Sequence, residues 1–466
     1  MTMTRPLSTA LALALLAAAA CAPRPGRRAT GLDAGAVELV RVAAEAAPAE
    51  RPRAGGGIAT AAPADPPPTV GVGEVYGDDI ATVQFGIAGL ELAPPIVELG
   101  GAARLLLTFD VLDPEVRQYR YDLTHCDRDW QRSQLSEIEY LSTFTEGDIT
   151  EFDLSFNAVT QYVHYQLTLP NQYVQYTKSG NYLLNVYDDV TGELVMRQRF
   201  CVVEPLAEVL VDQTRPAQVA LDRTHQEFDV GVSVDAGRFE NPRRTMSLTA
   251  MQNGDWRTAI YGLEPRFVRG EVLSWDYQNV LVWPASREWR ALDLRTIETQ
   301  GGRVAELTRE GDEFTALLYA DESRATYPPE TRIDLNGKFV IEDFDNRLDL
   351  QAEYVRAVFS LKAPRHPADR PVYLYGALTH YAFGEANRGV YNELTNSYLF
   401  DATLKQGFHN YAFVTPGEDG VRPVWADYEG NWFQTENEYQ FLLYYRPYGA
   451  RFDRLVGFAS VQVNRP

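Results

Sequence analysis

The sequence predicts an all-β protein: tandem β-sandwich domains of the immunoglobulin or fibronectin type that follow a signal peptide and a disordered linker. Aromatic residues make up 12% of the 466 residues, and the chain has 26 Tyr, 34 Gly and 27 Pro against 5 Met. This composition favours strands and tight turns over helices. Apolar residues also recur at every second position in many segments, which is typical of strands. Because single hydrophobic cores stop growing well below this length, we expect three folded domains.

The first 20 residues, 1–20, are predicted to be a lipoprotein-type signal peptide. Arg5 precedes an apolar run, residues 7–20, that is too short for a permanent transmembrane helix and ends in small side chains. Small residues before a Cys resemble a bacterial lipoprotein signal, in which Cys21 is the site of lipid attachment, although Ala18 stands where such signals usually have Leu. The alternative is an ordinary cleavable signal with Cys21 near the cut by chance. Both alternatives predict an exported protein.

Residues 21–75 are predicted to be a disordered tether. They are rich in Ala, Pro, Gly and Arg and have almost no aromatic residues, so they cannot bury enough apolar surface to offset the entropy of ordering. Their Pro content keeps such a tether extended. Residues 22–25 (Ala-Pro-Arg-Pro) contain none of the acidic residues that mark surface export in some bacteria. We therefore expect the folded part in the periplasm, at the periplasmic face of the outer membrane, anchored in its lipid through Cys21.

The strand patterns divide the rest of the chain into three β domains, 76–205, 206–330 and 331–466. In the first domain, alternating apolar positions between Asp-Pro, Pro-Asn and Ser-Gly-Asn breakers predict sandwich strands. These positions are Leu105, Leu107, Phe109, Tyr119, Tyr121, Leu123, Val163, Tyr165, Leu167, Leu169, Tyr182, Leu184 and Val186. In the last domain, Asn336-Gly337 predicts a hairpin, because both residues readily take the positive φ values of a type I′ turn.

The net charge of the folded part makes nucleic acid an improbable partner. After residue 75 the chain has 36 Lys or Arg and 58 Asp or Glu, a net charge of −22. A field of this sign repels phosphate backbones. We take solubility to be the main reason for the charge.

Two cysteines besides Cys21, Cys126 and Cys201, lie in strand-like segments of the first domain. In an oxidising compartment they could form a disulfide, which would close a loop of roughly 75 residues and stabilise the fold by several kcal/mol. Two separate buried thiols are the alternative, because sequence cannot show whether the two Cα atoms come close enough. The pattern leaves both alternatives open.

The sequence lacks recognisable catalytic, metal or cofactor motifs. It has no Gly-x-Ser-x-Gly, His-Glu-x-x-His, Cys-x-x-Cys or Gly-x-x-x-x-Gly-Lys, and its six His are scattered singly. His125 and His164 lie in strands, where a hydrogen-bonded structural role is more common than metal binding. We therefore predict a protein that is not an enzyme and that uses no catalytic residue, metal, cofactor or small-molecule substrate.

Three tryptophans of the aromatic-rich stretch, Trp275, Trp283 and Trp289, offer a test of function. Large flat side chains serve either a rigid core or a sugar-stacking platform. A core role is the safer prediction, and the exposure of these three side chains distinguishes the two.

The ordered motifs of the first domain resemble those of the type IX secretion system plug protein family. They are 121–130 (Tyr-Asp-Leu-Thr-His-Cys-Asp-Arg-Asp-Trp), 138–141 (Ile-Glu-Tyr-Leu), 162–165 (Tyr-Val-His-Tyr), 169–171 (Leu-Pro-Asn) and 179–184 (Ser-Gly-Asn-Tyr-Leu-Leu). The C-terminal motifs 435–439 (Thr-Glu-Asn-Glu-Tyr), 444–447 (Tyr-Tyr-Arg-Pro) and 453–457 (Asp-Arg-Leu-Val-Gly) are similar to the same family. The resemblance thus extends over roughly residues 76–466.

The resemblance implies a plug that docks on the periplasmic end of the large outer-membrane β-barrel translocon of the type IX system and reversibly closes it. An alternative is a carbohydrate-binding outer-membrane lipoprotein with β-sandwich modules, and a weaker one is an exported hydrolase. A glycan binder needs an exposed aromatic platform, whereas a plug needs an extended protein interface. His125, Asp127, Asp129 and Trp130 either form such an interface or hold the sandwich together, and we favour the second role.

Overall fold

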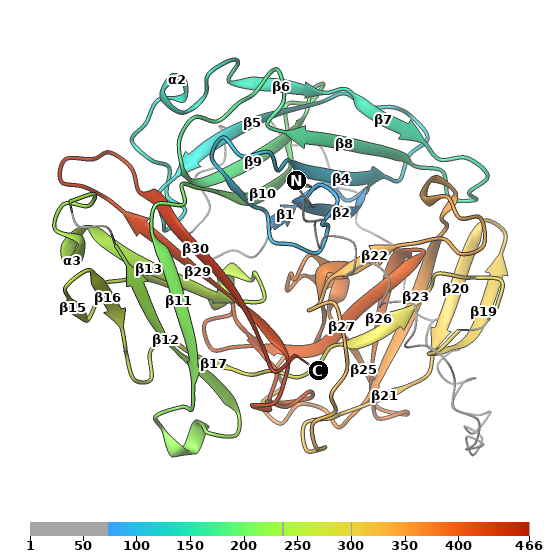
Figure 1. The fold of residues 1–466 in the computed structure, drawn as a ribbon. Coiled ribbons are helices and arrows are strands. Elements are labelled where there is room, and N and C mark those ends of the chain that lie inside the picture. The colour runs from blue at the N-terminus through green and yellow to red at the C-terminus, as the bar shows by residue number, and fades with distance from the viewer. Residues whose placement is uncertain (1–72, 235–236, 300, 466) are drawn as a thin grey trace, which may run out of the picture. The chain divides into compact units, whose positions relative to one another are not determined.

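The computed structural model describes residues 73–234, 237–299 and 301–465. All described residues belong to one compact unit, which lies within residues 49–466. The predicted signal peptide, Cys21 and the tether up to residue 72 lie outside the described residues and stay predictions. The predicted all-β class is confirmed, because the described chain consists of strands joined by turns and a few one-turn helices (Figure 1).

The helices of the described chain are all three or four residues long. They are α2 (Glu137–Tyr140), α3 (Pro242–Thr245) and the 3-10 turns η1 (Val219–Leu221), η2 (Trp256–Thr258), η3 (Asp349–Gln351), η4 (Ala377–Thr379) and η5 (Glu385–Asn387). Within the part of the chain that the structure describes, no helix has the length and apolar character needed to cross a membrane.

Two sheets that enclose a common core form lobe 1, residues 73–205. One has the order β1 (Gly73–Val75), β10 (Leu194–Val203), β9 (Gly180–Asp188), β5 (Tyr119–Cys126) and β6 (Glu146–Ile149), with β3 (Ile96–Glu98) added to β10. The other has the order β2 (Ile80–Ile87), β4 (Leu105–Val111), β8 (Val163–Leu169) and β7 (Glu151–Leu154). The alternating residues of β4, β5, β8 and β9 that predicted strands are buried in this core. The predicted strands of the first domain are therefore confirmed.

Lobe 2 combines residues 206–284 with the C-terminal hairpin, 437–463. One sheet has the order β11 (Glu208–Thr214), β12 (His225–Ser233), β16 (Val272–Trp275) and β15 (Phe267–Arg269), with β17 (Val282–Pro284) on β12. The other has the order β14 (Ile260–Leu263), β13 (Met246–Gln252), β29 (Asn437–Tyr445) and β30 (Arg454–Val463). Tyr439, Phe441 and Leu443 of β29 share the core of this lobe with Phe228 and Leu248.

Lobe 3 comprises residues 285–436. One sheet has the order β18 (Arg290–Asp293), β27 (Gly407–Pro416) and β22 (Phe339–Ile341), with β24 (Tyr373–Tyr375) and β28 (Pro423–Val424) also on β27. The other has the order β19 (Val304–Glu310), β20 (Glu313–Leu318), β23 (Tyr354–Lys362), β26 (Ser397–Lys405) and β25 (Val390–Asn392), with β21 (Asp321–Glu322) on β23. The sequence segment 331–466 thus contributes strands to two cores.

The turn at Asn336-Gly337 has the predicted conformation, but the predicted hairpin is wrong. Asn336 and Gly337 have φ values of 50° and 82°. The strand that follows, β22, pairs with β27 and not across the turn. Hydrogen bonds to other parts of lobe 3 hold the chain before the turn. Asp334 Oδ2 accepts from Trp289 N (2.6 Å), and Leu335 N donates to Asn410 Oδ1 (2.6 Å).

Candidate functional site at the junction of the three lobes

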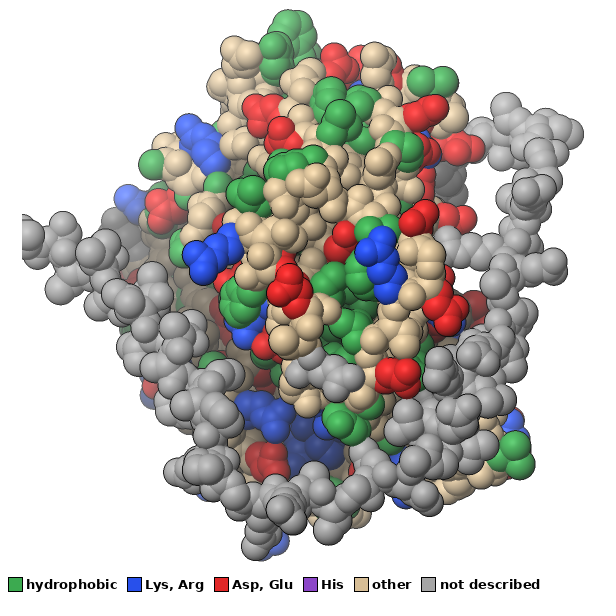
Figure 2. All heavy atoms as spheres, turned by 90° about the vertical axis from the view of Figure 1, so that its right-hand side faces the viewer, with side chains coloured by type: hydrophobic (Ala, Val, Ile, Leu, Met, Phe, Trp, Pro, Cys, Tyr) green, Lys and Arg blue, Asp and Glu red, His purple; other side chains and the backbone are tan. Residues whose placement is uncertain are grey.

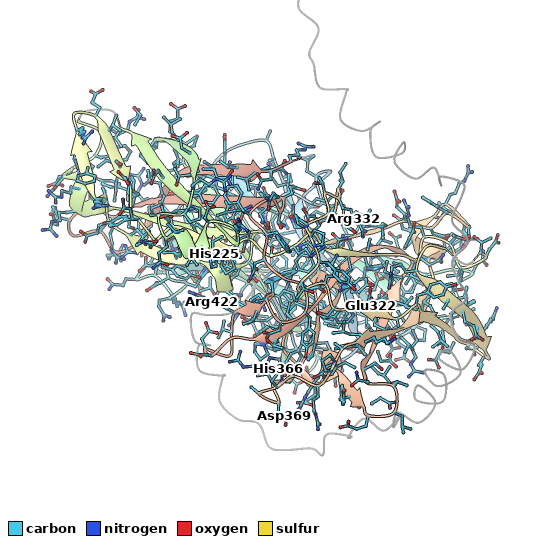
Figure 3. All side chains as sticks on the ribbon, turned by 90° about the horizontal axis from the view of Figure 1, so that it is seen from below. His225, Glu322, Arg332, His366, Asp369 and Arg422 are labelled. Atoms are coloured by element: carbon cyan, nitrogen blue, oxygen red, sulfur yellow. The ribbon has the colours of Figure 1, made fainter. Side chains whose placement is uncertain are left out.

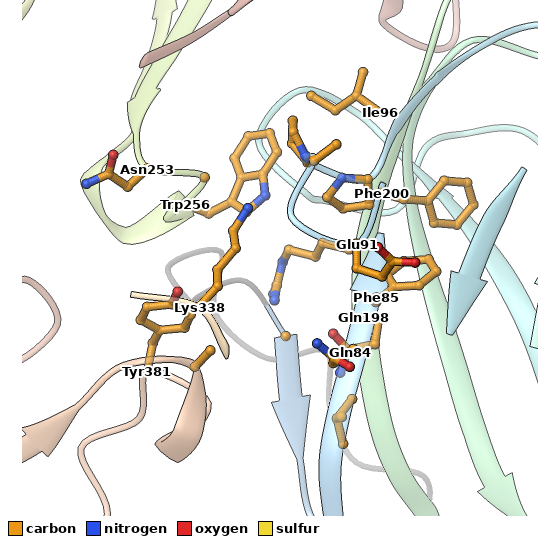
Figure 4. A pocket seen from close by; sticks show the side chains of 18 of the residues that line it. Gln84, Phe85, Glu91, Ile96, Gln198, Phe200, Asn253, Trp256, Lys338 and Tyr381 are labelled. Carbon is orange, nitrogen blue, oxygen red and sulfur yellow. The ribbon is translucent and has the colours of Figure 1, made fainter. Parts of the chain in front are cut away.

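The three lobes surround a cavity of about 120 Å³ (Figure 4). Its lining includes Gln84, Gln198 and Phe200 from lobe 1, Asn253 and Trp256 from lobe 2, and Lys338, His380 and Tyr381 from lobe 3. Burial lowers the pKa of His380 to about 4 and also lowers the pKa of Lys338. A cavity of this volume holds a few waters of about 30 Å³ each and is smaller than the roughly 300–1,000 Å³ of typical ligand sites. The junction thus brings polar and apolar side chains of all three lobes together around a small cavity.

The motif at 121–130 meets the C-terminal motifs at the contact between lobes 1 and 2. Arg446 donates to Asp127 Oδ2 (3.0 Å), and Asp453 N donates to Asp127 Oδ1 (2.9 Å). Arg128 N donates in turn to Asp453 Oδ2 (3.1 Å). The motif 121–130 and the C-terminal motifs thus hydrogen-bond to each other, although they are more than 300 residues apart in the sequence. Together they form one contact between lobes 1 and 2.

Trp130 adds an apolar component to this contact. Its ring lies edge-on to Trp256 of lobe 2, with 4.6 Å between centroids, in a buried cluster that also contains Leu442 and Tyr444. Tyr444 OH donates to Asn181 Oδ1 (2.7 Å), which places the Ser-Gly-Asn motif in the same interface. The sequence left open the roles of His125, Asp127, Asp129 and Trp130. Of these four residues, Asp127 and Trp130 hold lobe 1 on lobe 2.

His125 stabilises the turn that carries this interface, and Asp129 does not take part. The His125 ring is fully buried; Nε2 donates to Ser179 O (3.1 Å), so Nδ1 accepts from Ser133 Oγ (2.9 Å). Burial lowers the pKa of His125 and keeps the ring neutral. Gly180 has a φ of 136°, and a Cβ at that position would lie 2.7 Å from His125 Nε2, so the motif requires glycine. Asp129 is exposed, and among the residues that the structure describes it accepts a hydrogen bond from its neighbour Gln131 N alone (3.3 Å).

Lobes 1 and 3 share a buried ionic network centred on Asp110. Asp110 Oδ2 accepts from Lys405 Nζ (2.8 Å) and from Tyr354 OH (2.6 Å), and Oδ1 bonds to His164 Nδ1 (2.6 Å). Burial alone would raise the pKa of Asp110, but the His164 hydrogen bond and the Lys405 charge hold this pKa below its ordinary value. His164 is thus a structural residue, as predicted. Glu353 adds a second contact, because its carboxylate accepts from Val159 N (2.8 Å).

Arg257 joins lobe 2 to lobe 3. Its guanidinium is buried, forms an ion pair with Asp255 (2.9 Å) and donates to Tyr381 O and to Tyr375 OH. Burial alone would lower the pKa of Arg257, but the Asp255 carboxylate raises it, so the side chain is charged. Gln226 Nε2 of lobe 2 also donates to Phe433 O of lobe 3 (2.7 Å). Each pair of lobes is therefore joined by buried polar contacts.

Cys126 and Cys201 are both buried and lie on either side of Asn181. Each is in register with Asn181 of β9, so their Cα atoms are two strand spacings apart, about 10 Å. A disulfide spans less than about 7 Å between Cα atoms without backbone movement. Cys201 is a thiol whose Sγ contacts Asn181 Oδ1 (3.3 Å), and burial raises its pKa. Of the two alternatives that the sequence left open, the geometry favours two thiols over a disulfide.

The three tryptophans that test a sugar platform are buried. Trp275, Trp283 and Trp289 expose 0%, 3% and 4% of their surface, so the prediction of a core role is confirmed. The described residues contain no group of three or more His, Cys, Asp or Glu that could hold a metal ion. His225 of lobe 2 and His366 of lobe 3, for example, come from separate lobes (Figure 3).

The fold and the junction define a class: multi-lobed β-sandwich proteins whose most distinctive side chains join the lobes to one another. Residues 80–204 match the family model of the type 9 secretion system plug protein 1st domain. Over this segment the chain resembles the plug protein family, as the motifs predicted. The plug family is a family of non-enzymatic secretion components, and the match of this domain indicates a role related to type IX secretion and a location in the cell envelope.

A solved structure agrees over most of the chain. A hypothetical protein from Parabacteroides merdae is 30% identical, with a TM-score of 0.80, and the match covers 84% of this chain and 99% of that chain. The C-terminal domain of the Streptococcus pyogenes antigen I/II-family protein AspA is 8% identical over 82% of this chain and 98% of that chain. Its TM-score of 0.12 is too low to indicate a shared fold. No curated protein matches the chain.

Sequence reasoning missed the residues that join lobe 3 to the other lobes. Asp110, Lys405 and Arg257 belong to no recognised motif, and each is an ordinary charged residue in its local pattern. A charged residue among apolar neighbours in a strand, as in Phe109-Asp110-Val111, was the available signal. It indicates a buried charge but does not reveal its partner.

Proposed function

We propose that this protein is the plug of a type IX secretion system, which docks on the periplasmic end of the outer-membrane β-barrel translocon and reversibly closes it. The observation that carries this proposal is the family match over 80–204, within a fold that matches a 30% identical structure over 84% of the chain. Closure is steric and involves no bond chemistry. The plug is released when cargo or a shuttle component engages the translocon.

The interlobe contacts support a plug that moves as one body. Lobe 1 is joined to lobe 2 through Asp127 and Arg446, and to lobe 3 through Asp110 and Lys405, while Arg257 joins lobes 2 and 3. Separation of lobes 1 and 3 would leave the buried charges of Asp110 and Lys405 without each other, which is costly, so this separation is strongly disfavoured. Release from the translocon therefore needs displacement of the whole body.

The alternative, a carbohydrate-binding lipoprotein, has no supporting observation. The tryptophans that the sequence offered as its aromatic platform, Trp275, Trp283 and Trp289, are buried. The junction cavity is also small for a glycan.

Affinity purification of the tagged protein from its own membranes tests the proposal. We expect recovery of a large outer-membrane β-barrel protein in amounts comparable to the tagged chain. Recovery of sugars with no large barrel would contradict the proposal.

Lipid attachment at Cys21 would keep a displaced plug near its pore and speed rebinding through a high effective concentration. The variant Cys21→Ser, with the rest of the chain unchanged, tests this part separately. We expect the variant to leave the membrane fraction when no translocon is present. Unchanged membrane association would refute lipid attachment at Cys21.

A further inference from the structure

The outer edge of lobe 1 carries a row of exposed apolar side chains on β7. Phe152, Leu154 and Phe156 alternate along this strand and its end, with exposed fractions of 43%, 54% and 45%. They stand on the face of β7 that continues the core, since Phe152 is in register with the buried Tyr165 of β8 and its ring lies 5.9 Å from that ring. The lobe therefore leaves part of its apolar face uncovered at this edge.

The edge arises because the chain changes sheets at Thr150. The segment before it, β6, pairs with β5 of one sheet, and the segment after it, β7, pairs with β8 of the other. Each is the last strand of its sheet. The main chain of Glu151–Leu154 has no hydrogen bond outside its sheet to any other part of the described chain. The outward N–H and C=O groups of β7 are thus available to a further strand.

The other edge of the same sheet is already covered. In β2, Thr82 Oγ1 lies 2.6 Å from Tyr354 OH, and Gln84 Nε2 donates to Phe339 O (3.1 Å), both in lobe 3. β7 is the other edge of this sheet, and its own residues make no main-chain hydrogen bond to the described part of lobe 3, although Phe156 N, beyond the end of the strand, donates to Leu350 O of lobe 3 (3.2 Å). Figure 1 places β7 at the outer margin of lobe 1, and Figure 2, which faces this side, shows hydrophobic and acidic side chains next to one another over its upper part.

The acidic side chains of this edge define the chemistry of an added strand. Asp148, Glu151 and Asp153 are exposed, and none of them has an ion-pair partner among the described residues. Because side chains alternate along a strand, Glu151 and Asp153 lie on the opposite face from Phe152 and Leu154. A neighbouring strand would meet apolar groups on one face and carboxylates on the other.

We propose that β7 is a strand-addition site for an extended segment of a partner protein in which apolar residues alternate with Lys or Arg. This inference rests on the proposed function, in which the partner is the translocon, and it names the surface of the plug that contacts it. Main-chain hydrogen bonds hold the added segment, and the alternating side chains specify its register and orientation. Isolated charges on a sheet edge also prevent aggregation, but that role does not call for three exposed apolar side chains beside them.

Binding of the full exported chain to translocon purified from cells that lack this protein tests the inference. The variant Phe152→Ser/Leu154→Ser removes the apolar row, and Glu151→Lys/Asp153→Lys reverses the charge of the opposite face. The matched control is Phe267→Ser/Val268→Ser, which makes the same change on β15, another exposed edge strand. We expect each β7 variant to bind about tenfold or more weakly, and the control to bind within about twofold of the wild type.

Amide hydrogen exchange gives an independent readout of strand addition. We expect the outward amides of 151–154 to become protected in the complex, and thermal unfolding of the free variants to stay close to the wild type because the changed side chains are exposed. Wild-type affinity in both β7 variants, or no added protection of 151–154, would overturn the strand-addition site while leaving the proposed function intact. Absence of wild-type binding to the translocon would overturn both.

Discussion

Replacing Lys405 by Met should destabilise the protein strongly, because it leaves the Asp110 carboxylate buried without its cation. Lys405 Nζ lies 2.8 Å from Asp110 Oδ2, and the two side chains are 2% and 0% exposed. Met retains the length of the side chain, so the change creates little empty space. Removing one partner of a buried ion pair typically costs about 3–5 kcal/mol. We expect a loss near the lower end of this range, since Tyr354 and His164 still bond to the carboxylate.

Urea unfolding followed by circular dichroism measures this loss, and limited proteolysis shows whether lobes 1 and 3 separate first. Lys362→Met is the matched control, because Lys362 lies at the exposed end of β23 in the same sheet. The double variant Asp110→Asn/Lys405→Met removes both charges and should recover most of the stability. If the free energy of unfolding of Lys405→Met lies within about 0.5 kcal/mol of the wild type, the Asp110 network does not stabilise the contact between lobes 1 and 3.

The Asp110 network also predicts that the free energy of unfolding depends on pH in the acidic range. The pKa of Asp110 in the folded protein lies below its ordinary value, so the unfolded state binds a proton at a higher pH than the folded state. The stability that Asp110 contributes is therefore fully present above about pH 4 and is lost as the pH falls through the folded pKa. In Asp110→Asn, this part of the acid dependence should be absent.

Three further results are expected. Trp130→Ala should lower the free energy of unfolding by about 3–5 kcal/mol through loss of the Trp256 contact, with Trp130→Phe less severe; an unchanged urea midpoint would contradict the interlobe role. Burial lowers the pKa of His409 to about 4, so the folded state binds fewer protons than the unfolded state, and the free energy of unfolding should fall by about 1.6 kcal/mol between pH 6.5 and 5; His409→Gln should remove that part of the slope, and an identical slope would refute it. In Cys21→Ser, unfolding without reductant should expose two reactive thiols, Cys126 and Cys201, whereas a mass shift on reduction would reveal a disulfide.

The strands of lobe 1 were predictable because their information is local. Alternation at Leu105, Leu107 and Phe109 is enough to predict a half-buried strand, and β4 forms there. The motif 121–130 predicted the family in the same way, since it is a contiguous set of residues. The Trp-rich stretch was also correctly assigned to the core, because burial of large aromatic side chains is their commonest role.

Pairing between distant segments was not predictable. β29 contributes to lobe 2 through its pairing with β13, from Met246 opposite Tyr445 to Gln252 opposite Tyr439, and no local pattern encodes a partner nearly 200 residues away. The Asn336-Gly337 turn forms, yet the strand after it pairs with β27, because turn chemistry sets the backbone angles and not the strand partner. The Asp110 network depends on the same long-range assembly, so its residues could not be recognised as a site.

The conductance of the purified translocon in a planar bilayer tests closure of the pore most directly. The wild-type chain is added to the periplasmic side, with Phe152→Ser/Leu154→Ser added in a parallel experiment. We predict that the open pore closes on addition of the wild-type chain and reopens when the chain is removed by exchange of the solution. An unchanged conductance in the presence of bound, folded wild-type protein would contradict the account.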